Sequence, residues 1–412
     1  MPAAAVVTEV IMEEEKRRRI RHPVLLAVIV TAVVTAALTA VLAAVAVNAR
    51  LGGELSFARE HPKLRELSDV IDSRFVGEKD AEAVEEACAA AMVEGLGDPW
   101  SYYISAEDLK QYDITMANNY VGIGVTVRKP EEDDPLEVIS VQEGGGAEEA
   151  GILPGDLITA ADGVSFEGMV LEEATALVKG EEGTDVVLDI LRGEEKFTLT
   201  ITRKALPLEA VSGEMLDGIG YIRLDNFYTG TGDDFIRTAE SLLEQGASAL
   251  VMDVRFNGGG YVSELTQMLD YLLPEGTIFH MEFTDGTVHE TSSDAGCVDC
   301  PMAVLVNDCS YSAAEYFAEA IREFDCGIVG GQATTGKGYS QTMIRLSDGS
   351  GVNLSTARYF TPNGSSLAGT GIQPDIPVET DEDEYFAVYY GVLPREEDHQ
   401  LQAVLEALRN AE

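Results

Sequence analysis

The spacing of hydrophobic residues divides the chain into three parts. Between Glu54 and Leu96, apolar residues recur at the three- and four-residue steps of a helix face. From about Val121, short β-like runs separated by glycine-rich joints predict strands, with one helix at Leu171–Val178. After Pro207, strands alternate with helices, which is typical of an α/β domain. The expected strands of the middle part are Val121–Val127, Leu136–Val141, Leu157–Ala160, Val186–Leu191 and Phe197–Ile201.

The last part has the longest regular pattern. Its expected strands are Gly220–Leu224, Ala249–Val254, Met302–Val306 and a hairpin of Ile278–Phe283 with Thr287–Thr291. Its expected helices are Asp233–Gln245, Ser263–Leu273, Ser310–Phe324 and, after an acidic stretch, Leu401–Leu408. Short strands are expected between residues 325 and 356.

The first fifty residues predict a membrane anchor. Val24–Val47 is a run of 24 residues without charge, glycine or proline, about 36 Å long as a helix. The basic cluster Lys16–His22 precedes it, and the positive-inside rule keeps such a cluster in the cytoplasm. We therefore expect a single-pass helix in the cell membrane, with everything after Arg50 outside. A cleaved signal peptide ending at Ala44-Val45-Ala46 is the alternative, but the run is longer than a usual signal core.

Composition excludes several classes of protein. The chain of 412 residues has 28 Lys+Arg against 72 Asp+Glu, a formal net charge of -44, so general binding to nucleic acid is not expected. Five cysteines are too few for a disulfide-built scaffold. Because no His-x-x-x-His pair is present, zinc hydrolysis has no support, and we expect neither a metal nor a cofactor.

A serine at a predicted helix start is the first candidate for chemistry. Ser312 and Glu315 have the spacing of a capping box, which satisfies the first backbone N–H groups of a helix. The same position suits a nucleophile, because a hydroxyl there lies beside unpaired N–H groups. The local sequence favours the capping role.

A base for such a serine is more plausibly a lysine than a histidine, because none of the five histidines lies in a suitable motif. Lys337 lies in the glycine-rich loop Gly330–Gly338, and it acts as a base only if burial lowers its pKa toward neutrality. A solvated lysine in a turn is the default alternative. A phosphate-binding loop counted from Gly331 is disfavoured, because Gly338 stands where that motif needs Ser or Thr.

Two glycine-containing segments complete the candidates. Asn257-Gly258-Gly259-Gly260 follows a predicted buried strand, and its N–H groups could bind an oxyanion, although a plain turn is the local default. Ala147–Ile158 resembles the Ala-Gly-Leu-x-x-Gly-Asp-x-Ile signature of PDZ domains, which bind chain ends by adding a strand to a sheet edge. In that resemblance Gly122, Ile123 and Gly124 form the loop that holds a terminal carboxylate.

These features and several ordered motifs together resemble the carboxyl-terminal processing peptidases, also called tail-specific proteases, over roughly Leu64–Val378. The matching segments are Asp98-Pro99-Trp100-Ser101-Tyr102-Tyr103, Asp253–Gly260, Asn307–Glu315, Lys337 with Gln341, Ala357–Pro362 and Gly371–Asp375.

The resemblance implies a mechanism. Ser312 is the implied nucleophile, Lys337 the base and Gln341 the amide that orients the base. The implied oxyanion donors are the N–H groups of Gly259 and Ala313.

Two features lie outside the family pattern. Lys179 stands where the family often has Arg. Cys297-Val298-Asp299-Cys300 forms an extra loop, in which we expect a local disulfide rather than zinc.

The expected fold is an α/β protease domain with an inserted-type, β-rich PDZ domain, an N-terminal helical region and a single transmembrane helix. The expected boundaries are 1–23 for a cytoplasmic basic segment, 24–47 for the anchor, 51–115 for the helical region, 118–205 for the PDZ domain, 206–380 for the serine protease domain and 381–412 for an acidic C-terminal helical tail.

The expected function is that of a membrane-anchored serine endopeptidase, which recognises C-terminal tails through its PDZ domain and cleaves with a Ser-Lys dyad. The alternative is a catalytically inactive PDZ-type adaptor. The expected partners are protein or peptide substrates with free C-termini, the membrane through the N-terminal helix and, through the N-terminal helices, a second copy in a possible homodimer.

Overall fold

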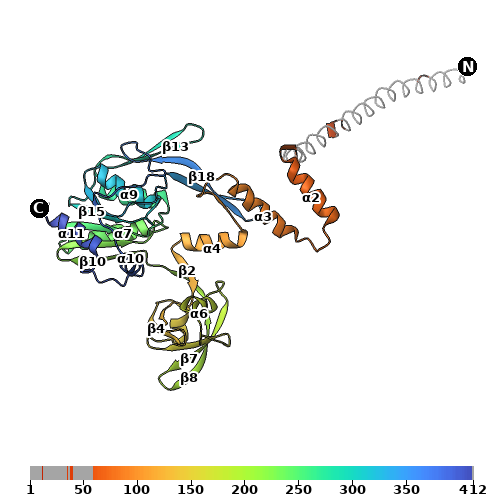
Figure 1. The fold of residues 1–412 in the computed structure, drawn as a ribbon, viewed down its shortest axis with the longest axis horizontal. Coiled ribbons are helices and arrows are strands. Elements are labelled where there is room, and N and C mark those ends of the chain that lie inside the picture. Colours follow the sequence, from red (N-terminus) through yellow and green to blue (C-terminus); the bar gives the residue numbers. More distant parts are fainter. Residues whose placement is uncertain (1–11, 13–34, 36–37, 40–58, 411–412) are drawn as a thin grey trace, which may run out of the picture. The chain divides into compact units, whose positions relative to one another are not determined.

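The structure is a computed structural model that describes residues 12, 35, 38, 39 and 59–410 (Figure 1). The chain divides into two compact units, Met1–Val84 and Glu85–Glu412. The described part of the first unit contains α2 (Pro62–Arg74) and the beginning of α3 (Ala81–Glu94). Proline at the first turn of α2 suits a helix start, because its missing N–H would have no helical partner there.

The expected transmembrane helix is not part of the observed fold, and we correct the fold class accordingly. Within the described ranges, no helix is both long and apolar enough to cross a membrane. The longest helices with described bounds, α3 and α7 (Thr231–Glu244), have 14 residues each, about 21 Å against a hydrocarbon core of about 30 Å. The segment that suggested the anchor, 24–47, lies outside the described residues except for positions 35, 38 and 39.

A six-stranded sheet forms the centre of the α/β domain, in the order β10-β11-β12-β15-β16-β19. Strands β11 to β19 are parallel, and β10 pairs with β11 in the antiparallel direction. The strands are β10 (Val211–Leu216), β11 (Ile219–Leu224), β12 (Ala249–Asp253), β15 (Met302–Val306), β16 (Gly327–Gly331) and β19 (Ile376–Pro377).

Both faces of this sheet are covered, which makes it the middle of three layers (Figure 1). Ile222, Met252 and Val304 point to the face covered by α7, α8 (Val262–Leu272) and α9 (Ala313–Glu323). Alternate strand residues such as Val251 point to the other face, covered by α11 (His399–Asn410). Burial on both faces explains why β12 and β15 are continuous apolar runs rather than alternating ones.

A second sheet is antiparallel and joins segments that are distant in sequence. In it β18 (Gly351–Phe360) pairs with β1 (Tyr102–Ile104), with β13 (Gly276–Phe283) and with β17 (Tyr339–Arg345). The hairpin partner of β13 is β14 (Val288–Ser293), across the turn at Asp285-Gly286. Because β1 precedes the segment expected to form a PDZ domain, residues on both sides of that segment build the α/β part. Helix α4 (Ala106–Met116) follows β1, and α10 (Glu382–Tyr389) precedes α11.

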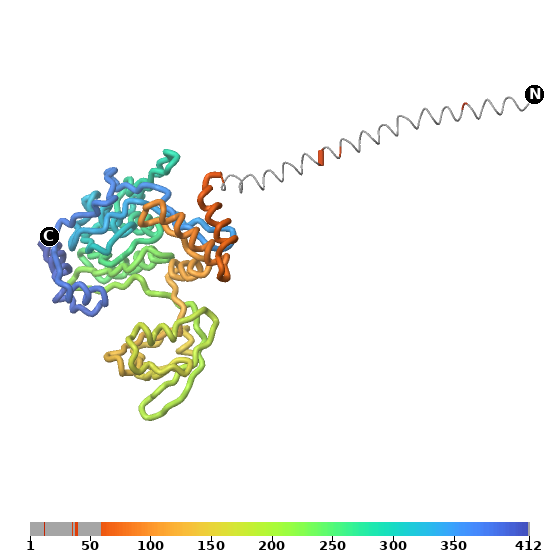
Figure 2. The backbone as a smooth tube through the Cα atoms, turned by 45° about the vertical axis from the view of Figure 1, so that its right-hand side comes forward, coloured from red at the N-terminus to blue at the C-terminus, as the bar shows by residue number. Residues whose placement is uncertain are grey.

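The segment expected to form a PDZ domain is a small β-rich body with its own core, centred on residues such as Ile123, Ile158 and Val186. Figure 2 follows the chain from α4 into this body and back out toward β10. The entering strand β2 (Asn119–Gly122) pairs with the leaving strand β9 (Lys204–Pro207). The remaining elements are β3 (Val125–Arg128), β4 (Leu136–Val141), α5 (Gly146–Ala150), β5 (Leu157–Ala161), β6 (Val164–Ser165), α6 (Leu171–Val178), β7 (Asp185–Arg192) and β8 (Glu195–Thr202).

The disulfide expected between Cys297 and Cys300 is not formed in the structure, where both residues are free thiols. Cys300 packs against the apolar core of the α/β domain, whereas Cys297 is exposed. One thiol is therefore half-buried while the other faces solvent.

Candidate active site

Three loops meet at one edge of the central sheet, because β12, β15 and β16 are parallel neighbours. The loop after β12 contains Asn257–Gly260, the loop after β15 leads to Ser312, and the loop after β16 contains Lys337. The carboxyl ends of parallel strands lie at the same edge, where α/β proteins place their binding sites. This topology brings together residues that are far apart along the chain.

Ser312 occupies a sharp turn between a strand and a helix. Its φ of 59° and ψ of -126° lie outside the helical region, so α9 begins at Ala313 rather than at the expected Ser310. Its hydroxyl makes no capping hydrogen bond. The turn therefore leaves the Ser312 side chain available for chemistry, at the cost of local backbone strain.

Glu315 joins this turn to the lysine loop. Its carboxylate is completely buried and accepts from the N–H groups of Ser312 at 3.0 Å and Lys337 at 2.9 Å. It also accepts from the Gly336 N–H at 2.7 Å and the Thr334 hydroxyl at 2.5 Å. Glu315 thus makes the hydrogen bond to the Ser312 N–H that the predicted capping box requires, and it also accepts hydrogen bonds from the lysine loop.

Ser312, Ala313, Lys337 and Gln341 line one cavity of about 640 Å³. Its wall contains many aromatic side chains, and besides Lys337 it has two charged residues, Asp113 and Arg345, which form a 2.6 Å ion pair. The aromatic residues are Trp100, Tyr102, Tyr112, Tyr228, Tyr261, Tyr311 and Tyr359. In the described part of the chain, no hydrogen bond joins Ser312 Oγ to Lys337 Nζ.

The ammonium group of Lys337 lies among aromatic rings rather than among acceptors. Its Nζ is 4.8 Å from the ring centre of Trp100 and 5.5 Å from that of Tyr311. Between residues 59 and 410 it has no hydrogen-bond or ion-pair partner. Burial lowers the pKa of Lys337 from 10.5 to about 8, although the negative charges of Asp98 and Glu315 act in the opposite direction.

Asp98 stabilises the turn that contains Trp100. Its carboxylate accepts from the Ser101 hydroxyl at 2.6 Å and the Trp100 N–H at 3.1 Å. Burial acts to raise the pKa of Asp98, but these bonds, one with Ser355 and the charge of Lys337 lower it overall. The Asp-Pro-Trp-Ser turn thus fixes an aromatic ring over the lysine and keeps one negative charge nearby.

The two expected oxyanion donors lie beside Ser312. A Cβ added to Gly259 would lie 2.8 Å from Ser312 Cβ and 2.9 Å from Ala313 N, so only glycine fits this close approach. The Gly259 N–H donates to Asn257 Oδ1 at 2.8 Å and is therefore engaged within its own turn. Ala313 is the first residue of α9, where a backbone N–H has no helical partner.

Gln341 lies in the same cavity but does not hold the lysine. Its amide nitrogen donates to the Tyr339 carbonyl at 2.9 Å and to Ser355 Oγ at 3.1 Å. The orienting role implied by the family resemblance thus has no hydrogen bond in this structure.

Gly122, Ile123 and Gly124 lie together in the PDZ domain, at a groove between β3 and α6. The groove is mainly apolar, with Val125, Ile158 and Val178 among its lining residues, and Lys179 lies at its edge. Strand β3 pairs only with β4 among the described strands, so its other edge is available to an added strand.

Three contributions to the site were not predicted from the sequence. They are the ring of Trp100, the ring of Tyr311 and the bonds from Glu315 to the lysine loop. The available signals were that the Asp98–Tyr103 and Asn307–Glu315 segments match motifs, which does not show what their side chains contact. In residues 59–410 no group of three or more His, Cys, Asp or Glu side chains could hold a metal ion.

Comparison with known proteins places this arrangement in a family. Residues 218–378 match peptidase family S41, and residues 137–192 match a PDZ domain. The carboxy-terminal processing protease CtpA of Bacillus subtilis (strain 168) is 33% identical over 321 residues, which cover 77% of this chain and 68% of that protein. A probable CtpA-like serine protease of Staphylococcus aureus (strain COL) is 31% identical over 322 residues, covering 77% and 64%.

A solved structure of an S41 protease from Bacteroides fragilis NCTC 9343 shares the fold, with a TM-score of 0.52 at 18% identity over 82% of this chain and 93% of that one. An α/β domain with a PDZ module, and with a serine and a lysine in one cavity, has the architecture of a PDZ-containing serine peptidase. The chain belongs to peptidase family S41, the carboxyl-terminal processing peptidases. It spans 64% of the length of the Staphylococcus aureus relative.

Replacing Glu315 by glutamine tests its bridging role. An amide keeps one acceptor oxygen but directs N–H donors at the N–H groups of the loops, so we expect a loss of about 2–4 kcal/mol in the free energy of unfolding. Urea unfolding measures this, and amide hydrogen exchange at Gly336 and Lys337 should quicken. Glu244→Gln, an exposed charge change, is the control, and equal stability of the two variants would contradict the role.

Labelling of Lys337 with acetic anhydride at a series of pH values tests the lowered pKa. Only the neutral amine reacts, so we expect half-maximal reactivity near pH 8 rather than 10.5, measured by mass spectrometry of the tryptic peptide. Asp98→Asn removes a negative charge that raises the pKa of Lys337, so the labelling midpoint of Lys337 in this variant should lie at lower pH. A midpoint near 10.5 in the unmodified chain would show that the amine is solvated.

Proposed function

We propose that this chain is a serine endopeptidase that cleaves proteins and peptides through Ser312 and Lys337. The observation that carries the proposal is that these two residues, 25 positions apart, line one cavity in which burial lowers the pKa of the lysine to about 8. A lysine with such a pKa is partly neutral near physiological pH, as a general base must be.

The reaction begins with proton transfer from Ser312 Oγ to the neutral Lys337 Nζ, as Oγ forms a bond to a peptide carbonyl carbon. The carbonyl π electrons move to its oxygen, which the Ala313 N–H stabilises. The Gly259 N–H becomes a second donor once it exchanges its bond to Asn257. Lys337 then protonates the leaving amine, and the C–N bond breaks to give an acyl-enzyme. Water then attacks the carbonyl carbon of the acyl-enzyme, with Lys337 as base. Cleavage of the ester bond releases the carboxylic acid product and restores the Ser312 hydroxyl.

Gln341 supports the base indirectly in this proposal. Its amide connects Ser355 with the Tyr339 carbonyl, two residues after Lys337. Through these bonds it fixes the direction in which the lysine side chain leaves the loop. A direct hydrogen bond between the Gln341 amide and the Lys337 amine would require a rotation of the Gln341 side chain.

The PDZ groove is proposed to bind the substrate tail. A peptide that pairs with the open edge of β3 would place its terminal carboxylate at the N–H groups of Gly122, Ile123 and Gly124. The apolar lining of the groove favours an apolar last residue. The extracytoplasmic location and the homodimer stay predictions from the sequence.

Loss of either dyad member should abolish cleavage. We expect Ser312→Ala and Lys337→Met to lower kcat/KM for an unstructured protein at least about 10³-fold, because the nucleophile or its base is gone. Gel and mass-spectrometric assays of digestion measure this. Ser292→Ala and Lys110→Ala replace exposed residues of the same types and should cleave normally. Undiminished activity in both dyad variants would remove the mechanism, and an inactive unmodified chain would favour the adaptor.

Tail capture is tested by peptide binding. Amidation of a peptide's C-terminus should weaken its binding about tenfold or more, because charge-assisted hydrogen bonds to the carboxylate are lost. Gly124→Ala should have a similar effect, since its Cβ would lie 3.0 Å from Leu206 Cδ1 and 3.1 Å from Gly145 Cα.

Gly183→Ala is the matched control for tail capture. It has a similar positive φ but open space around the added Cβ, so it reproduces the backbone strain without the clash. Fluorescence anisotropy gives the Kd values. Equal affinity for the free and amidated peptides would exclude carboxylate recognition at this loop.

A further inference from the structure

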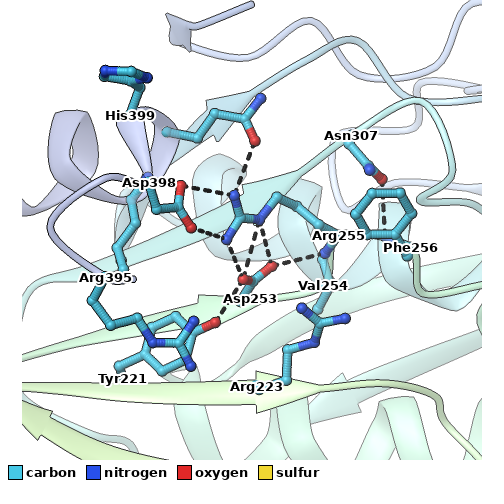
Figure 3. A network of polar contacts seen from close by, with 12 residues as sticks. Tyr221, Arg223, Asp253, Val254, Arg255, Phe256, Asn307, Arg395, Asp398 and His399 are labelled. Carbon is cyan, nitrogen blue, oxygen red and sulfur yellow. Dashed lines mark hydrogen bonds and ion pairs between the residues drawn. The ribbon is translucent and has the colours of Figure 1, made fainter. Parts of the chain in front are cut away.

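A buried cluster of charged residues connects the C-terminal part of the chain to the central sheet (Figure 3). The Arg255 guanidinium is 1% exposed and lies between two buried carboxylates. It donates to Asp253 Oδ2 at 2.6 Å and to Asp398 at 2.7 and 3.0 Å. Gln400 Oε1 accepts from it at 3.1 Å, and the Tyr221 hydroxyl donates to Asp253 at 2.7 Å. Two of these acceptors, Asp398 and Gln400, belong to the C-terminal part of the chain.

The place of Arg255 in the sequence gives the cluster its importance. Asp253 ends β12, and the residues directly after Arg255 form the turn with Gly259. The turn continues the same backbone without an intervening element. Because the Arg255 guanidinium is held by two carboxylates, the backbone of Arg255, from which the glycine turn continues, is restricted in position as well.

Phe256, the next residue, is strained and is held by the same part of the chain. Its φ of 62° is unusual for a residue with a bulky side chain. Its ring centre lies 4.8 Å from that of Tyr385 and 5.2 Å from that of Tyr389, both on α10. Its N–H donates to Asn307 Oδ1 at 2.9 Å. Aromatic contacts with α10 thus help to maintain a backbone conformation that is unfavourable in isolation.

Helix α10 also contacts the loop that leads to Ser312. The Tyr385 hydroxyl donates to Asp308 Oδ1 at 2.9 Å and lies 3.2 Å from Cys309 Sγ. The same tyrosine therefore touches two loops: its ring contacts the loop after β12, and its hydroxyl contacts the loop that leads to Ser312.

The two loops are in turn joined to each other beside Ser312. The Tyr311 N–H donates to the Asn257 carbonyl at 3.1 Å, and the backbone of Gly259 lies against Ser312 and Ala313. A shift of either loop would change the position of the N–H groups relative to Ser312 Oγ. Those N–H groups are the proposed oxyanion donors.

We propose that the C-terminal segment, residues 381–400, is a positioning element of the active site, with Asp398 and Tyr385 as positioning residues. Asp398 fixes the glycine turn through Arg255, and Tyr385 fixes the spacing between that turn and the Ser312 loop. Neither residue lines the cavity, so both act through the backbone. The inference rests on the proposed peptidase function and adds residues that the family motifs do not include.

A purely stabilising role is the competing explanation. Replacing a whole buried ion pair by apolar side chains of similar volume is often neutral or stabilising, whereas removing one partner leaves an uncompensated buried charge and is strongly destabilising. Asp398 also accepts from the Leu401 N–H at 2.9 Å and so caps α11. Its removal would therefore lower stability under either explanation, and only catalytic measurements on folded protein separate the two.

The test uses the full chain and two variants with matched controls. Tyr385→Phe keeps the ring on Phe256 and removes only the hydroxyl, while Tyr390→Phe makes the same change at an exposed neighbour. Asp398→Asn removes the buried charge, while Glu397→Gln makes the same change one residue away on the surface. Measurements are kcat and KM on an unstructured protein, the melting temperature, and the affinities for a peptide boronic acid and for a product peptide. The boronic acid forms a tetrahedral adduct with the serine and reports on the oxyanion site.

We expect kcat to fall about tenfold or more in Tyr385→Phe and Asp398→Asn, with KM within about twofold. Affinity for the boronic acid should fall by a similar factor, with product binding unchanged and both controls like the unmodified chain. Folded variants with unmodified kcat, or with equal losses for both ligands, would overturn the inference. If Asp398→Asn fails to fold, Tyr385→Phe alone decides. An unmodified chain that cleaves nothing overturns the proposed function first and this inference with it.

Discussion

The Glu315 carboxylate is the interaction on which the geometry of the site depends. It is fully buried, it forms no ion pair with any residue of 59–410, and four donors satisfy its two oxygens. An unsatisfied buried carboxylate would be very costly, so the Ser312 turn and the lysine loop are constrained to keep these donors in place. The first turn of α9 favours a negative charge at this position. Two loops from different strands are thus held in fixed register through one side chain.

Burial explains how the pKa of Lys337 falls to about 8 in so acidic a protein. A net charge of -44 favours protonated amines, and Asp98 and Glu315 act in that direction locally. Burial outweighs them, because the rings of Trp100 and Tyr311 exclude water from one side of Nζ. The rings come from segments more than 200 residues apart, and β1 pairing with β18 is what brings the first of them to the site. The pKa of Lys337 is therefore a property of the tertiary fold rather than of its loop.

The sequence predicts the parts of this protein in which one periodicity dominates. The buried strands β12 and β15 and the helices α7 and α8 were predicted within a few residues, because both faces of the sheet are apolar. Ordered motifs brought Ser312 and Lys337 into the candidate site, although local pattern alone favoured a cap and a solvated lysine. Helix α10 lies within the predicted acidic C-terminal helical tail, but the sequence predicts a helix only at Leu401–Leu408, since the aromatic residues of α10 follow no clear helical spacing. The partners of Gly259 and Gln341 depend on side-chain rotamers, which no spacing rule specifies.

Strain at the site follows a common logic. Ser312 and Phe256 both have positive φ values, and each lies in the loop that follows a central strand. Such conformations persist only where the surroundings supply compensating contacts. Glu315 supplies them for Ser312, and the rings of α10 supply them for Phe256. The two sets of contacts are independent, yet the Tyr311 N–H bond to Asn257 couples their outcomes. A change in either set of contacts would therefore shift the same few backbone N–H groups beside Ser312. Residues as distant in sequence as Glu315 and Tyr385 thus affect the geometry of one site.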